Sequence, residues 1–311
     1  MKKFIINILS FLLLLTIIAY ISISLPPTPR LLTSPIYGKI KKDSLLNHTK
    51  GPRIVFLGGS NLPFGLNSKM IKDSLNLNPV NAGIMHTIGL KKILDNYLNY
   101  VKTNDVVIIS PEYQHFFGDF MNGHESTLYY NSIGNRNPFQ GLDYDQFSNL
   151  VPYLPKYVFK KLDPREYYGY SVSKFFNSQS YNQFGDIQAH WTLESISFSS
   201  NNGINDKFNQ DIIEYLLYFQ DIISKKNARL YISPPPFNEN SAKNNTNQIQ
   251  LVERCLKNVG FKTLGEFEKY IFHDTLFFNS SYHLTKDGAM IRTQMFVEDY
   301  KARTHNNVYK K

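Results

Sequence analysis

The feature that most constrains this chain is an apolar run near its N-terminus. Residues 4–24 read FIINILSFLLLLTIIAYISIS and contain no charged side chain. As an α-helix that rises ~1.5 Å per residue, this run would span ~31 Å, which matches the hydrocarbon core of a bilayer. Cleaved signal peptides have shorter apolar regions of ~7–15 residues, so residues 1–25 are predicted to form an uncleaved membrane anchor.

The charges around this run bear on its orientation. Lys2 and Lys3 precede the run, but further basic residues follow it, so the positive-inside rule alone does not decide the orientation. A short basic head before an apolar run is typical of export signals, which favours an N-terminus on the inside. We therefore expect a single-pass membrane protein whose domain faces the periplasm or the cell exterior.

Residues 26–52 carry prolines and a large share of the charge. Four prolines between residues 26 and 35 interrupt any continuing helix, so we expect an extended stalk. Residues 1–53 hold eight of the 34 basic groups and one of the 25 acidic groups, which leaves the rest of the chain close to neutral. A nucleic-acid-binding domain normally carries a basic face, so no nucleic-acid partner is expected.

Beyond the predicted stalk, short apolar strands alternate with amphipathic helices in units of about 30 residues. This alternation is typical of a parallel sheet covered by helices on both faces. We predict a three-layer α/β/α sandwich over residues 53–303, with a mostly parallel five-stranded sheet. The predicted strands are residues 53–57, 79–83, 105–110, 228–233 and 261–264, and the predicted helices are residues 68–75, 89–102, 206–226, 244–258 and 285–303.

The alternation of strands and helices lapses between about residues 116 and 205. This stretch is rich in Asn, Tyr, Phe, Gln and Ser. It is too long and too aromatic for a plain loop, so we interpret it as an inserted cap. Its aromatic side chains either pack this cap or offer a carbohydrate-binding surface. Residues 304–311 are interpreted as a basic tail.

A serine preceded by two glycines follows the first predicted strand. Gly58 and Gly59 permit a sharp turn, which places Ser60 at the carboxyl edge of the sheet, where such folds bind ligands. A plainer interpretation makes Ser60 only the cap of the next helix. The glycines do not form G-x-G-x-x-G and no phosphate-loop lysine is present, so a nucleotide-binding function is disfavoured.

Two further residues can complete a nucleophilic site. His283 precedes the last predicted helix, and a histidine delivered to the strand ends can take the proton of a serine hydroxyl. Gly83 follows the second predicted strand, where its N–H can stabilise an oxyanion. The other histidines lack a metal-ligand spacing such as H-E-x-x-H, and the chemistry calls for no metal or organic cofactor.

The order of these motifs resembles that of the SGNH, or GDSL-like, hydrolase and acyltransferase superfamily. The resemblance covers the region after the predicted stalk. It rests on Gly59 and Ser60 as the first motif, Gly83 as the second, and residues 280–283 before the last helix as the fifth. It implies an SGNH/flavodoxin-like fold in which Ser60 is the nucleophile and His283 is the base. It also implies that the N–H groups of Ser60 and Gly83 form the oxyanion hole.

The sequence departs from this superfamily at two motifs. The position of the catalytic aspartate holds Ser280, preceded by Asn279, and Glu112 is a third candidate for orienting His283. A Ser–His dyad, or an asparagine in the orienting role, can remain active. The third motif normally brings an asparagine into the oxyanion hole, and Gln114 is the candidate donor here.

Two functions fit these observations. The first is that of an exported, membrane-anchored serine esterase or O-acyltransferase, which acts on an acyl ester of a cell-envelope glycan or a similar small acceptor. The second is that of a catalytically degenerate scaffold, which binds a glycan or an envelope-assembly partner. A Ser60 hydroxyl within hydrogen-bond reach of His283, beside an open cleft at Gly83, is what catalysis predicts.

Overall fold

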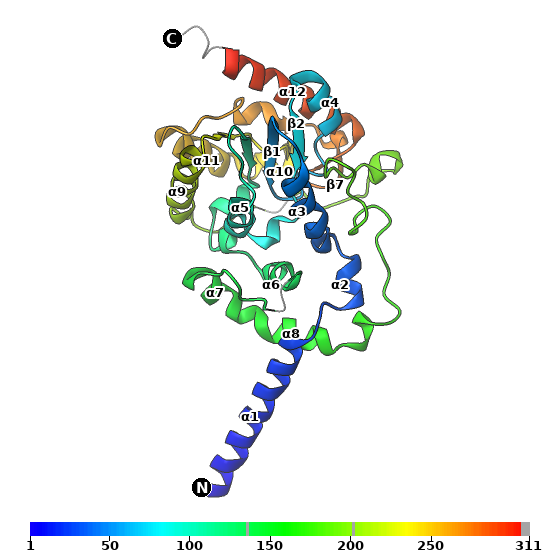
Figure 1. Ribbon diagram of the computed structural model, residues 1–311, viewed down its shortest axis with the longest axis vertical. Coiled ribbons are helices and arrows are strands. Elements are labelled where there is room, and N and C mark those ends of the chain that lie inside the picture. The colour runs from blue at the N-terminus through cyan, green and yellow to red at the C-terminus, as the bar shows by residue number, and fades with distance from the viewer. Residues whose placement is uncertain (135–136, 201–202, 306–311) are drawn as a thin grey trace.

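A parallel sheet forms the centre of the protein, whose computed structural model describes residues 1–134, 137–200 and 203–305 (Figure 1). Its four strands lie in the order β2-β1-β3-β4, and every neighbouring pair is parallel. β1 and β3 are buried along their whole length, which suits their β-branched side chains. The predicted α/β fold with a mostly parallel sheet is confirmed. The strands are β1 Arg53–Gly58, β2 Asn78–Asn81, β3 Val106–Ser110 and β4 Arg229–Ile232.

The fifth strand predicted for this sheet is not found among the described residues. Residues 261–264 make one parallel bridge, between Thr263 and Ile232, at the free edge of β4. Gly260 and Gly265 flank this segment and both have positive φ angles, of 83° and 77°. The two turns leave too few extended residues between them for a longer ladder. Two short pairs complete the strands: β5 Phe237–Asn238 with β6 Ile271–Phe272, and β7 Phe277–Ser280 with β8 His283–Leu284.

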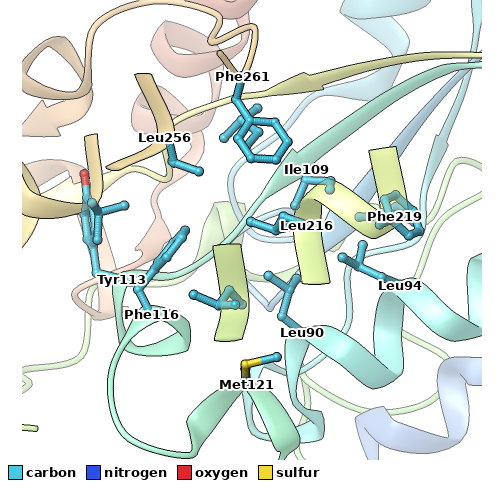
Figure 2. Close-up of a cluster of buried hydrophobic side chains, with 14 of the residues drawn as sticks. Leu90, Leu94, Ile109, Tyr113, Phe116, Met121, Leu216, Phe219, Leu256 and Phe261 are labelled. Carbon is cyan, nitrogen blue, oxygen red and sulfur yellow. The ribbon is translucent and has the colours of Figure 1, made fainter. Parts of the chain in front are cut away.

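Three helices lie against one face of the sheet, together with Leu46 of the segment before β1. Alternate side chains of the strands, such as Val55 and Val107, point into this layer. Figure 2 shows how Leu90 and Leu94 of the first helix meet Leu216 and Phe219 of the second beside β3. The regularly spaced apolar residues that predicted these helices are therefore the residues that pack them against the sheet. They are α5 Leu90–Leu98, α9 Asp211–Lys225 and α11 Thr246–Asn258.

The other face of the sheet is covered by α4 Ser68–Leu75 and α12 Lys286–His305. Phe56 of β1 packs edge-on against Phe296 of α12, with 5.2 Å between the ring centres. The strand residues that face this layer alternate with those that face the opposite layer. Helices therefore lie against both faces of the sheet, and the predicted helix at residues 68–75 has the observed bounds.

The N-terminal apolar run forms α1 Lys2–Ser24, which projects away from the domain (Figure 1). Nearly all of its side chains are exposed, although the helix carries no charge between Phe4 and Ser24. It is long and apolar enough to cross a membrane or to act as a signal sequence. The prediction of an N-terminal apolar helix is confirmed at this level.

The segment between α1 and the sheet is not the extended stalk that its prolines suggested. It contains α2 Pro29–Thr33, a 3-10 turn and α3 Lys39–His48. Pro29 and Pro35 each begin a helical turn, where a missing N–H costs nothing, so they start helices instead of excluding them. Buried Lys42 of α3 donates hydrogen bonds to the carbonyls of Asn81 and Gly185. The segment is therefore packed onto the domain.

The described residues between positions 116 and 205 form short helices joined by long irregular stretches. They share an apolar cluster with residues of α2 and the following turn, which includes Leu31, Ile36 and Tyr157. The predicted cap therefore packs against the N-terminal segment. Of the predicted basic tail, residues 306–311 lie outside the described residues, and α12 extends into the rest. The helices are α6 Glu125–Ser132, α7 Tyr144–Leu150 and α8 Leu154–Leu162, and α10 Glu239–Lys243 follows β5.

Candidate active site

Ser60 lies in the turn that follows β1. A Cβ atom on Gly58 would approach the carbonyl oxygen of Ser110 to 2.4 Å, and one on Gly59 would approach Glu112 Oε1 equally closely, at 2.4 Å. Both positions therefore need glycine, because the end of β1 packs directly against the chain that follows β3. Ser60 is not the cap of the next helix: Asn67 caps α4, and its side chain accepts a hydrogen bond from Met70 N.

His283 reaches Ser60 from the other end of the chain. It opens β8, just before α12, and its Nε2 lies 2.8 Å from Ser60 Oγ. Its ring stacks on Phe64, with ring centres 4.1 Å apart and an angle of 11° between the planes. The structure thus brings together the two residues that the sequence predicted as nucleophile and base.

Asn279 holds the other nitrogen of this histidine. Asn279 Oδ1 lies 2.7 Å from His283 Nδ1, so Nδ1 carries the hydrogen and donates it to the amide oxygen. Nε2 is then left with its lone pair directed at the hydroxyl of Ser60. This is the arrangement that general-base activation of a serine requires. Of the three candidates for the orienting role, Asn279 is the one in contact with the ring.

The charge state of His283 follows from its surroundings. Burial, with smaller contributions from the neighbouring His86 and His190, lowers the pKa of His283 to about 3. The imidazole is therefore neutral at pH 7 and can accept a proton. Asn279 has no charge to stabilise the imidazolium once it forms, which makes this histidine a weaker base than one held by a carboxylate.

The other two orienting candidates have different partners. Ser280 Oγ accepts hydrogen bonds from the N–H groups of Tyr282 and His283, so it shapes the turn that presents the imidazole. Glu112 lies on the opposite wall, where its carboxylate accepts a hydrogen bond from Asn61 N and sits 3.3 Å from His86 Nδ1. Neither side chain hydrogen-bonds the ring of His283 in the part of the chain that the structure describes.

The three predicted oxyanion donors differ in whether they are free to bind a ligand. Ser60 N has no hydrogen-bond acceptor among the described residues, so it remains free for a ligand. Gln114 lines the cavity, and its side-chain amide makes no hydrogen bond within the described residues; Nε2 is the atom that can donate to an oxyanion, because Oε1 only accepts. Gly83 does not line the cavity, and its N–H donates to Asn81 Oδ1 at 3.2 Å. The expectation for Gly83 was wrong, because a side chain two residues away already satisfies its N–H.

An open cavity of about 300 Å³ lies beside the Ser60 hydroxyl. Its walls come from segments far apart in the chain, including the loops after β1 and β3, β5, α10 and the β7–β8 turn. Most of the exposed lining is apolar, as in many ligand-binding cavities. The lining residues are Ser60, Met85, His86, Glu112, Gln114, Phe176, Phe198, Ser199, Ile204, Phe237, Ser241, Asn279, Ser280, Ser281, Tyr282 and His283.

The sequence analysis missed the buried arginine behind this cavity. Arg292 donates hydrogen bonds to the carbonyl and the side chain of Asn61, at 2.7 and 3.1 Å, and to Ser110 Oγ at 3.0 Å. It therefore holds the turn that carries Ser60, and its burial lowers the pKa of the guanidinium to about 9. The available signal was its place in α12, where it shares the apolar face of Ala289 and Phe296.

Comparisons of this chain with protein-family models, with curated proteins and with solved structures found no match. Within residues 1–134, 137–200 and 203–305, no group of three or more His, Cys, Asp and Glu side chains is arranged to hold a metal ion.

Proposed function

We propose that this protein is an SGNH-like serine esterase or O-acyltransferase. The observation that carries this proposal is the chain of contacts from Ser60 through His283 to Asn279, at the wall of an open cavity. A serine activated in this way attacks acyl carbonyls, and the cavity has room for an acyl group and part of its carrier. Acyl esters of cell-envelope glycans, or similar small esters, are the proposed substrates.

The proposed reaction passes through an acyl-enzyme. Ser60 Oγ attacks the acyl carbonyl while His283 Nε2 takes its proton, and the oxyanion accepts hydrogen bonds from Ser60 N–H and the Gln114 amide. His283 then returns the proton to the departing alcohol as its C–O bond breaks. A water or a sugar hydroxyl, deprotonated by His283, attacks the acyl-serine and restores free Ser60. Water as the acceptor makes the protein an esterase, and a sugar makes it a transferase.

The assignment to the SGNH class rests on the placement of these residues in the fold. Ser60 follows the first strand of a parallel sheet, and His283 precedes the last helix, as that superfamily requires. In this proposal the segment at residues 261–264 is a shortened fifth strand, and the two helical layers with the sheet form the three-layer sandwich. Asn279 takes the place of the usual carboxylate, and Gly83 is not an oxyanion donor.

We place the site outside the cell membrane. α1 is the proposed anchor, with its basic N-terminus inside and the domain on the periplasmic or exterior side. This location is what connects the chemistry to envelope polymers, since acyl groups on such polymers are added and removed there. A single N-terminal helix is the only membrane contact that this part of the proposal needs.

A non-catalytic scaffold is the second candidate. Two observations favour it: His283 is oriented by the neutral Asn279, and the N–H of Gly83 is already occupied. In this alternative the cavity and the aromatic side chains Phe176 and Phe198 at its wall bind a glycan or an assembly partner without reaction.

Ester turnover distinguishes these two functions. The full chain, purified in detergent, is assayed with a chromogenic acetyl ester, with and without a saccharide acceptor. Turnover that is lost in Ser60→Ala and His283→Ala, but kept in Ser199→Ala, is the expected result. Ser199 is the matched control because it lines the same cavity but has no hydrogen bond to a histidine among the described residues. A folded protein without turnover that still binds saccharide would favour the scaffold.

A further inference from the structure

Exposed apolar side chains gather in one part of the predicted cap. Outside α1, most large apolar side chains are buried, and the exposed ones are scattered over the surface except between residues 144 and 172. Scattered exposed apolar residues need no explanation, but a concentration of them marks an interaction surface. The exposed members are Tyr144, Phe147, Val151, Phe159, Leu162, Tyr168 and Val172.

The geometry of α8 arranges part of this set as a stripe. Val151, Pro155, Phe159 and Leu162 follow one another at spacings of three or four residues, which places them on one side of the helix and of the turn before it. All four are exposed, and the neighbouring Tyr157, on the other side of the helix, is buried. α8 therefore has apolar side chains on its exposed side as well as on its buried side. A helix that only covers a core needs them on the buried side alone.

α8 also lies at the point where α1 leaves the domain. Ser22 Oγ, in the last turn of α1, donates a hydrogen bond to Val158 O at 2.8 Å, and Lys161 Nζ donates one to Leu25 O at 2.7 Å. Figure 1 shows α8 beside the domain end of α1, on the side of the domain opposite α12. A membrane crossed by α1 therefore has its surface at the level of α8.

We propose that the exposed apolar stripe of α8 lies in the interfacial layer of the lipid bilayer that α1 crosses. The end of α1 hydrogen-bonds α8, so the interface of a bilayer crossed by α1 is the partner that the chain itself places beside this helix. Lys156 and Lys160 flank the stripe, and their long side chains suit a helix that lies at headgroup level.

This contact gives the domain a second attachment to the membrane. A single transmembrane helix leaves a domain free to tilt, whereas a second contact on a helix that crosses its end fixes the tilt and the height of the cavity. The proposal does not depend on the chemistry of Ser60. It predicts a property of the whole chain in lipid, whichever function the cavity has.

The test places a fluorophore on α8 in the full chain. Cys255 is the only cysteine, so a Cys255→Ala background allows Phe159→Cys to be labelled with an environment-sensitive nitrobenzoxadiazole dye. The matched control is Tyr218→Cys on α9, because Phe159 is 61% exposed and Tyr218 57%. Leu13→Cys on α1 reports whether the anchor itself is in lipid. The proteins are reconstituted in phosphatidylcholine–phosphatidylglycerol vesicles with or without lipid-attached nitroxide quenchers.

The expected result is a blue-shifted emission at position 159 that shallow nitroxides quench at least about twofold more than at position 218, as interfacial depth requires. Deep nitroxides quench the label at position 13 most. A label at 159 that is as polar and as poorly quenched as the one at 218 would overturn the proposal. So would a blue shift without lipid quenching, because a second copy or another protein would then cover the stripe.

Discussion

The two ends of the central sheet are built in opposite ways. At the amino end, buried Asp105 accepts four hydrogen bonds: from Arg53 Nε and Nη2, from the Tyr97 hydroxyl and from Lys102 N. At the carboxyl end, Ser60 N and the Gln114 amide oxygen have no protein partner within the described residues, and an open cavity lies beside them. At the amino end the polar groups hydrogen-bond one another, whereas at the carboxyl end polar groups remain without a protein partner.

The difference shows how a parallel sheet separates stability from chemistry. All strands of the sheet point the same way, so side chains at their amino ends, such as Arg53 and Asp105, meet one another and the ends of the segments that precede the strands. The loops after the strands diverge and leave a crevice at the carboxyl end, where such folds bind ligands. Substitutions at the amino end should therefore change the free energy of unfolding, and substitutions at the carboxyl end should change the reaction rate.

The largest effect is expected at the carboxyl end. Ser60→Ala should lower ester turnover by ~10⁴-fold or more, because it removes the atom that forms the covalent bond. Stability should hardly change, because the Ser60 hydroxyl makes its hydrogen bond only to His283 in the described structure. Initial rates and urea unfolding of the same preparation measure both quantities. A variant that kept its turnover would remove Ser60 from the mechanism.

A substitution at the amino end of the sheet should lower stability and leave turnover unchanged. Asp105→Ala leaves the buried Arg53 without its counter-charge, and the free energy of unfolding should fall by about 3–5 kcal/mol. The turnover of the fraction that remains folded should be unchanged. Urea unfolding followed by circular dichroism gives the stability, and the double variant Arg53→Met/Asp105→Leu is the control that should recover much of it. A large loss of turnover at full stability would contradict the separation of the two ends.

Asn279→Asp sharpens the comparison by giving the open end a charge. An ionised carboxylate in place of the amide oxygen, 2.7 Å from His283 Nδ1, should raise the pKa of this histidine and stabilise its imidazolium. We expect ester turnover at pH 7 to rise roughly tenfold, and the acid limb of the pH–rate profile to move to higher pH. Asn279→Ala should lower turnover. Equal rates for all three proteins would show that Asn279 does not orient the base.

The last prediction concerns acid stability. Burial lowers the pKa values of His115, His190 and His283 to about 3, 4 and 3, so all three are neutral in the folded protein at pH 5. In the unfolded chain they take up protons below a pH of about 6.5, so the stability that they contribute is lost as the pH falls below that value. Each should cost up to about 2 kcal/mol between pH 6.5 and 5. Thermal unfolding measured at both pH values tests this, and an unchanged Tm would contradict it.

Local sequence patterns predicted much of the fold and of the candidate site. β1 and β3 are continuous apolar runs, and the apolar spacing of α5 and α9 marked the layer that covers them. Ser60 and His283 were predictable because each adjoins an element that the pattern defines: the end of the first strand and the start of the last helix. The turn between β7 and β8 brings His283 Nε2 to 2.8 Å from Ser60 Oγ at the carboxyl edge of the sheet, where such folds bind ligands.

What the sequence did not reveal depended on contacts between distant segments. Whether the N–H of Gly83 is free depends on the rotamer of Asn81, which no spacing rule describes. The role of Arg292 depends on α12 crossing the turn after β1. The prolines of residues 26–52 predict an extended stalk, but two of them occupy first helical positions in a segment that packs against the predicted cap.

The most direct test of the central claim is to locate the nucleophile. The full chain is treated with a fluorophosphonate, digested and mapped by mass spectrometry, beside His283→Ala and the cavity control Ser199→Ala. We expect one adduct, on Ser60, in the wild type and in Ser199→Ala, and at least a ~10³-fold slower reaction in His283→Ala. A folded protein that forms no adduct on Ser60, or one whose adduct forms equally fast without His283, would contradict an activated serine at this site.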